Sequence, residues 1–483
     1  MAPHNGWREL RVSEFAEVIG GTTPPTSDPS YFGGDIPWLT PKDLSNFQGR
    51  YIARGERNLT REGVEAAGLR ILPSGTVLLS TRAPIGYVAI AKNPITTNQG
   101  FRSLIVKPGF EPEFIYYLLK RDTERLKAFS SGTTFGELSG STLAELRFSI
   151  PPLPEQRAIT RVLGSLDDEI VSRKGESKGL RRIFNHLMRH LLDGNWPVQE
   201  GERWLHEVRP VVQAYDDKIE LNRRMNQTLE EICRALFKFW FVGFGPVRAK
   251  MEGRWKKGES LPGMPADMWD LWPSEFEESE IGEIPKGWEV GPISSVVEVN
   301  PERRLLKGEV VPYVEMSQLP TLSARVVGWV GRAFTSGSRF RNGDVLVARI
   351  TPCLENGKTA YVDFLDGSKI GWGSTEFLIL RARAPLAPQW AYCLARTEDF
   401  RMHLIQNMTG TSGRQRAPAE CLDSFVVAIP AGEIASQFGR LVAPWFERLK
   451  ANDDESSTLA VVRDALVPKL LSGEIRVAEG GNQ

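Results

Sequence analysis

Residues 73–84, PSGTVLLSTRAP, recur later in the chain as residues 341–352, RNGDVLVARITP. In each stretch a glycine, Gly75 or Gly343, comes directly before a short apolar run, and a proline ends the stretch. A turn signal followed by four to eight apolar residues indicates a buried strand. Because internal self-similarity indicates a duplicated fold, we compared the flanking sequence of the two copies.

The similarity continues in the same order in both halves of the chain. Residues 97–106, TNQGFRSLIV, resemble residues 373–380, GSTEFLIL, and each is followed by an aromatic helical segment, residues 114–119 or 389–395. Residues 131–134 and 409–412 then precede a final strand that ends at Pro151 or Pro430. The sequence therefore predicts two similar mixed α/β domains with curved β-sheets, at residues 1–152 and 284–431. We also expect a tight hairpin turn at Asn356–Gly357, the residue pair that such turns favour.

Helical segments follow each domain. We expect a central helical region at residues 153–245, a linker at 246–283 and a C-terminal helical region at 432–483. Apolar residues three and four apart form stripes typical of an antiparallel coiled coil, which packs on itself or on a partner protein. The residues of these stripes that we assign to partner binding are Leu221, Met225, Leu229, Ile232, Leu236, Leu459, Val462 and Leu466.

The central helical region contains a second repeat. Residues 166–170, LDDEI, recur as residues 215–219, YDDKI, and residues 180–194 resemble the end of a helical region. Pro197 and Pro210 bracket an interruption, because proline removes a helical hydrogen bond. We therefore expect a break near residues 195–210 and an additional helical hairpin.

Composition limits the class of protein. The 483 residues carry 60 basic and 60 acidic side chains, whereas nucleic-acid binders often have a basic excess. The distribution is uneven, since residues 325–349 hold five arginines against one acid, Asp344, and are a candidate for contact with phosphate. The four cysteines are scattered, which fits reduced thiols in the cytoplasm. There is no apolar run long enough to span a membrane.

Three motifs resemble catalytic or metal sites and are better explained otherwise. Residues 241–245, FVGFG, match the glycine loop of adenine methyltransferases, but a helical stretch precedes them and the companion catalytic tetrapeptide is absent. Residues 356–359, NGKT, resemble part of a P-loop without the helix that should follow. His186 and His190 share a helix face without an intervening glutamate. The sequence therefore predicts no catalytic residue and no metal site.

Four stretches together resemble the specificity subunits of type I restriction-modification systems. They are residues 150–157, IPPLPEQR; residues 216–226, DDKIELNRRMN, with 235–241, ALFKFWF; residues 284–290, IPKGWEV; and residues 466–475, LVPKLLSGEI. With the repeat, they cover nearly the whole chain. The doubled central region departs from the family pattern, which has one central helical region.

The resemblance implies a non-catalytic subunit that gives a larger complex its DNA sequence specificity. Each domain would read one half of a split site in double-stranded DNA, and the helices would set the spacing. Two methyltransferase subunits would dock on the helices, and translocating nuclease subunits would join them. S-adenosylmethionine would bind the methyltransferase partner, and this chain would bind no cofactor.

Polar residues on loops are the candidates for DNA reading, because bases are recognised by side-chain hydrogen bonds and phosphates by cations. In the second domain the cluster Gly413–Arg416 is the strongest candidate, since arginine pairs with guanine and glutamine with adenine. The complete set of candidates is Thr22, Thr23, Lys42, Arg82, Asn98, Gln99 and Thr134 in the first domain, and Arg349, Ser374, Thr375, Arg414, Gln415 and Arg416 in the second.

Two alternatives stay open at this point. The chain could be a degenerate scaffold that binds partners without reading DNA, which its neutral net charge would suit. It could also be a self-sufficient DNA adenine methyltransferase, with residues 241–245 as the cofactor loop. Binding of S-adenosylmethionine by the isolated chain would distinguish the methyltransferase from the other two.

Overall fold

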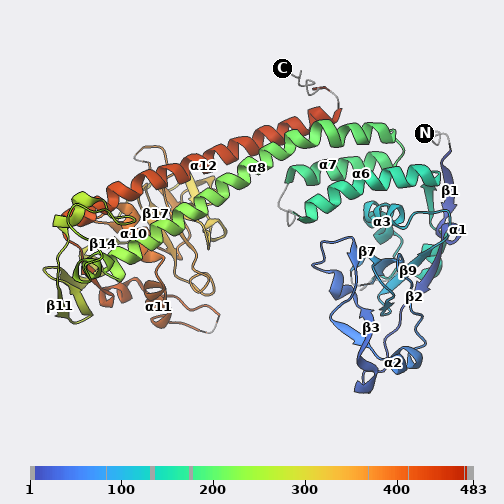
Figure 1. Cartoon of the computed structure of the whole chain (residues 1–483), viewed down its shortest axis with the longest axis horizontal. Helices are drawn as coiled ribbons and strands as arrows, with labels where there is room; N and C mark the ends of the chain where they lie inside the picture. Colours follow the sequence, from blue (N-terminus) through green and yellow to red (C-terminus); the bar gives the residue numbers. More distant parts are fainter. Residues whose placement is uncertain are drawn as a thin grey trace. The chain divides into compact units, whose positions relative to one another are not determined.

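The computed structural model describes residues 6–82, 84–130, 136–172, 178–367, 369–411, 413–472 and 474–475 (Figure 1). The chain forms two compact units. The first contains Met1–Lys218 with Leu459–Gln483, and the second contains Ile219–Thr458. The two long helices, α8 and α12, therefore contribute residues to both units. No helix among the described residues has the length and apolar character needed to cross a bilayer.

The first β domain is built on two sheets and a closing strand pair. The larger sheet has the order β2-β9-β6-β7-β4, the smaller has the order β5-β3-β8, and β1 pairs with β10. The strands are β1 Arg8–Arg11, β2 Ala16–Gly20, β3 Phe32–Leu39, β4 Tyr51–Ile52, β5 Arg57–Leu59, β6 Val77–Thr81, β7 Ile85–Ala91, β8 Thr96–Thr97, β9 Phe101–Val106 and β10 Arg147–Ile150. The α-helices are α1 Val12–Phe15, α2 Arg61–Ala66, α3 Pro112–Arg121, α4 Thr123–Ala128 and α5 Gly140–Glu145.

The second β domain has the same arrangement of two sheets and a closing strand pair, with four strands in each sheet. Its sheets have the orders β14-β21-β18-β19 and β16-β15-β20-β17, and β13 pairs with β22. Its strands are β13 Glu289–Pro292, β14 Val297–Val299, β15 Val310–Val314, β16 Val330–Ala333, β17 Ser338–Phe340, β18 Val345–Ala348, β19 Thr359–Tyr361, β20 Gly371–Gly373, β21 Phe377–Ala382 and β22 Val426–Ile429, and its α-helices are α10 Pro388–Ala395 and α11 Glu398–Gln406.

Equivalent details confirm that the two domains share one fold. The turn glycines Gly75 and Gly343 both have φ +86°, a left-handed conformation that favours glycine. An equivalent pair of strands is parallel in both domains, β3 with β8 in the first and β15 with β20 in the second. The expected tight turn at Asn356–Gly357 is wrong. Strands β18 and β19 do pair, but residues 349–358 connect them through successive turns, with Asn356 N donating to Pro352 O at 3.0 Å.

The expected linker is also wrong, because residues 246–283 are folded into the second unit. They form α9 Gly245–Met251, a 3-10 helix at Ala266–Leu271 and the strand pair β11 Phe276–Ser279 and β12 Gly282–Pro285. Trp255 and Trp272 of this segment are buried in the core. The large apolar area of two tryptophan side chains favours burial over a solvated linker.

Three helices follow the first domain: α6 Leu153–Ser172, α7 Lys178–Leu192 and α8 Val198–Phe237. Figure 1 shows α6 and α7 side by side next to α3, and no single helix runs from Pro154 to Phe241. The predicted break at residues 195–210 is wrong for most of its length, since α8 begins at Val198 and contains Pro210. The hydrophobic core of the first unit contains three buried side chains from this part of α8, Trp204, Val208 and Val212. The free energy gained by burying them offsets the roughly 3 kcal/mol that a proline inside a helix costs.

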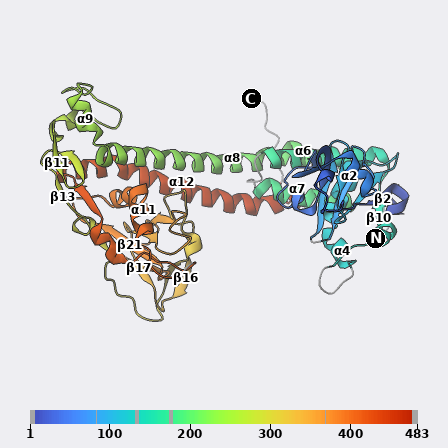
Figure 2. The same cartoon turned by 90° about the horizontal axis from the view of Figure 1, so that it is seen from below.

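Within the second unit, α8 lies beside α12 Gly432–Ser472 (Figures 1 and 2). The predicted coiled-coil seam on α8 is buried only in part: Leu236 lies in the core of the second unit and Leu229 packs against it, so neither is free to bind a partner. Leu221 and Ile232 are 52% and 47% exposed, whereas their neighbours Asn222 and Cys233 are buried. On α12, in the first unit, Val462 is exposed and its neighbour Arg463 is buried. The inner face of these helices is therefore partly polar, and some of the apolar residues expected in the seam face solvent.

Candidate nucleic-acid interface

In the first domain, two polar loops lie against each other. Thr22 N donates to Thr97 O at 3.1 Å, and the Thr23 hydroxyl donates to the Gln99 side-chain oxygen. A Cβ at Gly21 would lie 2.1 Å from the carbonyl oxygen of Asn98, so this close approach requires glycine. The structure thus brings together four candidates, Thr22, Thr23, Asn98 and Gln99. The Asn98 side chain itself accepts from Gly100 N at 2.9 Å and shapes the turn.

The cationic candidates of the first domain stand on separate segments. Lys42 is exposed and pairs with the exposed Glu56 at 3.0 Å, an ion pair that solvent weakens and a phosphate could replace. Arg82 is exposed, and within the described ranges its guanidinium has no hydrogen-bond or ion-pair partner. The backbone of Arg82 bridges to Glu137, which pairs with Arg102 at 3.2 Å. Thr134 lies outside the described residues.

In the second domain, the candidates gather around one carboxylate, Glu376. Arg416 Nε donates to Glu376 Oε1 at 2.8 Å, and Arg349 Nε donates to Glu376 Oε2 at 3.4 Å. Glu376 N donates to the Ser374 hydroxyl at 3.2 Å, and Thr375 beside it is exposed. Glu376 therefore orients two guanidinium groups at one end of the domain.

The segment that carries Arg414, Gln415 and Arg416 is fixed by its backbone. Thr351 N donates to Gln415 O at 3.1 Å, and Ala417 N donates to Arg349 O at 2.8 Å. The Arg414 side chain is exposed and has no hydrogen-bond or ion-pair partner in the part of the chain that the structure describes. A rigid backbone that presents a free arginine suits base recognition, because arginine can donate two hydrogen bonds to a guanine.

Glu376 is the residue that the sequence did not single out. The internal repeat aligns it with Gly100, so it is a charged side chain where the first copy has none. An equivalent isolated backbone bridge lies beside the polar cluster in each domain, between Arg82 and Glu137 in the first and between Ile350 and Arg416 in the second. The two clusters therefore occupy equivalent positions in the fold but differ in chemistry.

The arginines at residues 325–349 do not form one phosphate-facing surface. Arg325 pairs with Asp363 at 2.7 Å, Arg339 donates to Arg303 O at 2.8 Å and Arg349 is held by Glu376. Arg332 lies over the ring of Tyr313 at 4.7 Å. A count of charges along the sequence misses these partners because they come from other parts of the chain.

The motifs that resemble catalytic sites have structural roles. Phe241 and Phe244 of residues 241–245 are buried and contact Trp288, and a helix precedes them. His186 and His190 lie with ring centroids 4.2 Å apart, next to Trp196. No group of three or more potential metal ligands occurs among the described residues.

A duplicated β domain with a different polar cluster in each copy, attached to long paired helices, is the architecture of a DNA-recognition subunit. Comparison with known proteins gives the family. Residues 4–180 match the "Type I restriction modification DNA specificity domain". The chain is 33% identical to the "Type I restriction enzyme MjaIX specificity subunit" of Methanocaldococcus jannaschii, over 98% of this chain and 94% of that protein.

A more distant relative is the HindI specificity subunit of Haemophilus influenzae, 25% identical over 58% of this chain and 68% of that protein. A solved S subunit from M. genitalium aligns over 97% of this chain and 99% of that one, with 16% identity and a TM-score of 0.41. The chain belongs to the specificity subunits of type I restriction-modification systems. It is thus a non-catalytic recognition subunit, and the alternative of a self-sufficient methyltransferase is wrong.

Proposed function

We propose that this subunit directs its complex to a bipartite target in double-stranded DNA, with each β domain reading one half. One observation carries the proposal. The two domains share one topology and place polar clusters at equivalent positions, yet the clusters differ in sequence. Two copies of one scaffold with different contact residues would recognise two different half-sites.

The same proposal assigns roles to the residues of the clusters. Arg414 and Gln415 contact base edges in the second half-site, with Arg416 and Arg349 oriented by Glu376. Thr23 and Gln99 contact base edges in the first half-site. Lys42 and Arg82 contact phosphates and position the first domain, since contacts with phosphate fix orientation without reading sequence.

The helices set the distance between the half-sites. Helix α8 has 40 residues, and α12 has 41. At about 1.5 Å per residue, each is roughly 60 Å long, whereas one turn of DNA is about 34–36 Å. Half-sites read from one side of the duplex would therefore lie one to two turns apart.

Methyltransferase subunits dock on the helices. Exposed or half-buried apolar residues, Leu221, Met225 and Ile232, follow the outer face of α8, and Leu459, Val462 and Leu466 follow α12. Exposed apolar rows of this kind mark protein contacts. The two rows provide docking positions for two methyltransferase subunits, which translocating nuclease subunits join.

The rest of the proposal concerns chemistry and location. The methyltransferase binds S-adenosylmethionine and methylates an adenine flipped out of the duplex, while this chain selects the DNA sequence at which methylation occurs. The complex acts in the cytoplasm, in keeping with the four free cysteines.

Co-expression with the cognate methyltransferase, followed by genome-wide mapping of N6-methyladenine, tests the proposal. Two short half-sites around a fixed unspecified spacer are the expected result. Partner binding without new methylation would indicate the degenerate scaffold instead. Absence of partner binding would contradict the docking assignment.

A further inference from the structure

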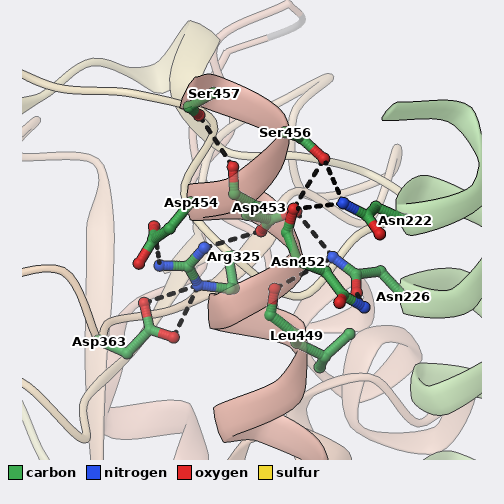
Figure 3. A network of polar contacts seen from close by, with 10 residues as sticks. All are labelled: Asn222, Asn226, Arg325, Asp363, Leu449, Asn452, Asp453, Asp454, Ser456 and Ser457. Carbon is green, nitrogen blue, oxygen red and sulfur yellow. Dashed lines mark hydrogen bonds and ion pairs between the residues drawn. The ribbon is translucent and has the colours of Figure 1, made fainter. Parts of the chain in front are cut away.

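Asp453 of α12 joins three elements of the second unit (Figure 3). Its Oδ1 accepts a hydrogen bond from Asn226 Nδ2 of α8 at 2.7 Å. Its Oδ2 accepts one from Arg325 Nη1 of the second β domain at 2.8 Å. One carboxylate therefore holds the helix pair together and attaches the recognition domain to it.

The contact between α8 and α12 around Asp453 is polar and directional. Asn452 Nδ2 donates to Asn226 Oδ1 at 2.8 Å, and Asn222 Nδ2 donates to Glu455 Oε2 at 2.8 Å. Asn222 and Asn452 are buried. A buried asparagine in a coiled coil fixes the register, because a shifted register leaves its amide without partners. Apolar side chains at these positions would tolerate such a shift, since the hydrophobic effect has no direction.

The link from the helices to the domain is equally well defined. The Arg325 side chain is 10% exposed, and its Nε donates to both carboxylate oxygens of Asp363, at 2.9 and 2.7 Å. Asp363 follows β19, and Arg325 itself forms a parallel bridge to Tyr361 at the end of that strand. Its guanidinium is thus fixed to the edge of the sheet before it reaches α12.

The first domain contains a similar link. Arg50 directly precedes β4, which pairs in parallel with β7, the counterpart of β19. Its side chain is 9% exposed, and Nη2 donates to both oxygens of Asp168 on α6, at 2.9 and 3.1 Å. In each domain, therefore, a largely buried arginine at the same sheet edge pairs with an aspartate on the helix that follows the domain.

We propose that Asp453, with Asn226 and Arg325, determines which spacer length the complex accepts, by fixing the α8–α12 register and the orientation of the second β domain on α12. This inference rests on the proposed reading of a bipartite target. Asp453 acts through the position of other groups and contacts no base. Its loss should change the tolerated spacing and leave the sequence of both half-sites unchanged.

The test maps N6-methyladenine after co-expression of the full chain with its methyltransferase, for wild type and Asp453→Ala. For the variant, we expect methylation at spacers one base pair longer or shorter, so that discrimination between spacers falls by about tenfold or more, the factor that one charge-assisted hydrogen bond provides. The matched control is Asp454→Ala. Asp454 is adjacent, its side chain is 64% exposed and its carboxylate is 3.9 Å from Arg325, so the spacing should not change.

The outcomes separate the two proposals. A wild-type protein that methylates no bipartite motif would refute the proposed function itself. A fixed spacer in wild type that stays fixed in Asp453→Ala would overturn this inference alone, even if the melting temperature drops. If Asp453→Ala fails to assemble, two other variants each remove one hydrogen bond of Asp453: Arg325→Gln removes its bond to the second β domain, and Asn226→Ala removes its bond to α8. Relaxed spacing in either supports the inference, and unchanged spacing in both overturns it.

Discussion

Replacement of Tyr392 by phenylalanine removes one hydroxyl from the core of the second unit. Tyr392 is fully buried, and its hydroxyl donates to Glu230 Oε1 of α8 at 2.7 Å. Glu230 is 2% exposed, and burial raises the pKa of its carboxyl group. The substitution leaves a buried carboxylate without this donor, which costs about 1–3 kcal/mol. For a unit of roughly 150–250 residues, that lowers the melting temperature by about 2–12 °C.

The cost should depend on pH. Because the folded-state pKa of Glu230 is raised, its contribution to stability is present below its ordinary pKa of 4.5 and is lost as the pH rises through the folded-state pKa. Tyr392→Phe should therefore cost more at pH 8, where a larger fraction of the carboxyl group is charged, than at pH 5. Glu230→Gln should stabilise the unit at pH 8 and remove most of the cost of Tyr392→Phe.

Thermal unfolding followed by calorimetry at pH 5 and pH 8 measures both effects. Glu231→Gln, at the exposed neighbouring position, is the control and should change neither melting temperature. The reasoning would be refuted if Tyr392→Phe lowered the melting temperature equally at the two pH values, or if Glu230→Gln did not raise it at pH 8.

Three further predictions concern function. Arg414→Ala should alter recognition of only the second half-site, because its side chain is the free arginine of that cluster; methylome mapping checks this, and unchanged methylation sinks the assignment. Glu376→Ala should lower discrimination between the correct and mismatched second half-site by about tenfold, since Arg416 loses its orienting partner. Competition binding with mismatched duplexes measures this, and an unchanged ratio of the affinities for matched and mismatched DNA would contradict it. Leu221→Glu with Ile232→Glu should abolish methyltransferase docking without lowering the melting temperature, as both side chains are exposed; a pull-down with intact binding would argue against this surface.

The sequence by itself determined the duplicated domain, the helical regions and the family. These features follow from local order along the chain, such as the turn glycines Gly75 and Gly343 and the apolar runs after them, which need no knowledge of distant residues. It also located the polar loops around Gln99 and Arg414, because loop residues of these types stand out between strands.

Only the tertiary structure decided which helix faces are buried and how the site residues are held. The pattern of apolar residues placed Leu221 and Ile232 in the seam, but the buried residues of α8 include Asn222, whose partners lie on α12 more than two hundred positions away. Glu376 shows the same limit, since its partner Arg416 comes from another loop. A polar side chain is stable inside a protein only when its hydrogen-bond partners surround it, and those partners are set by the folded chain.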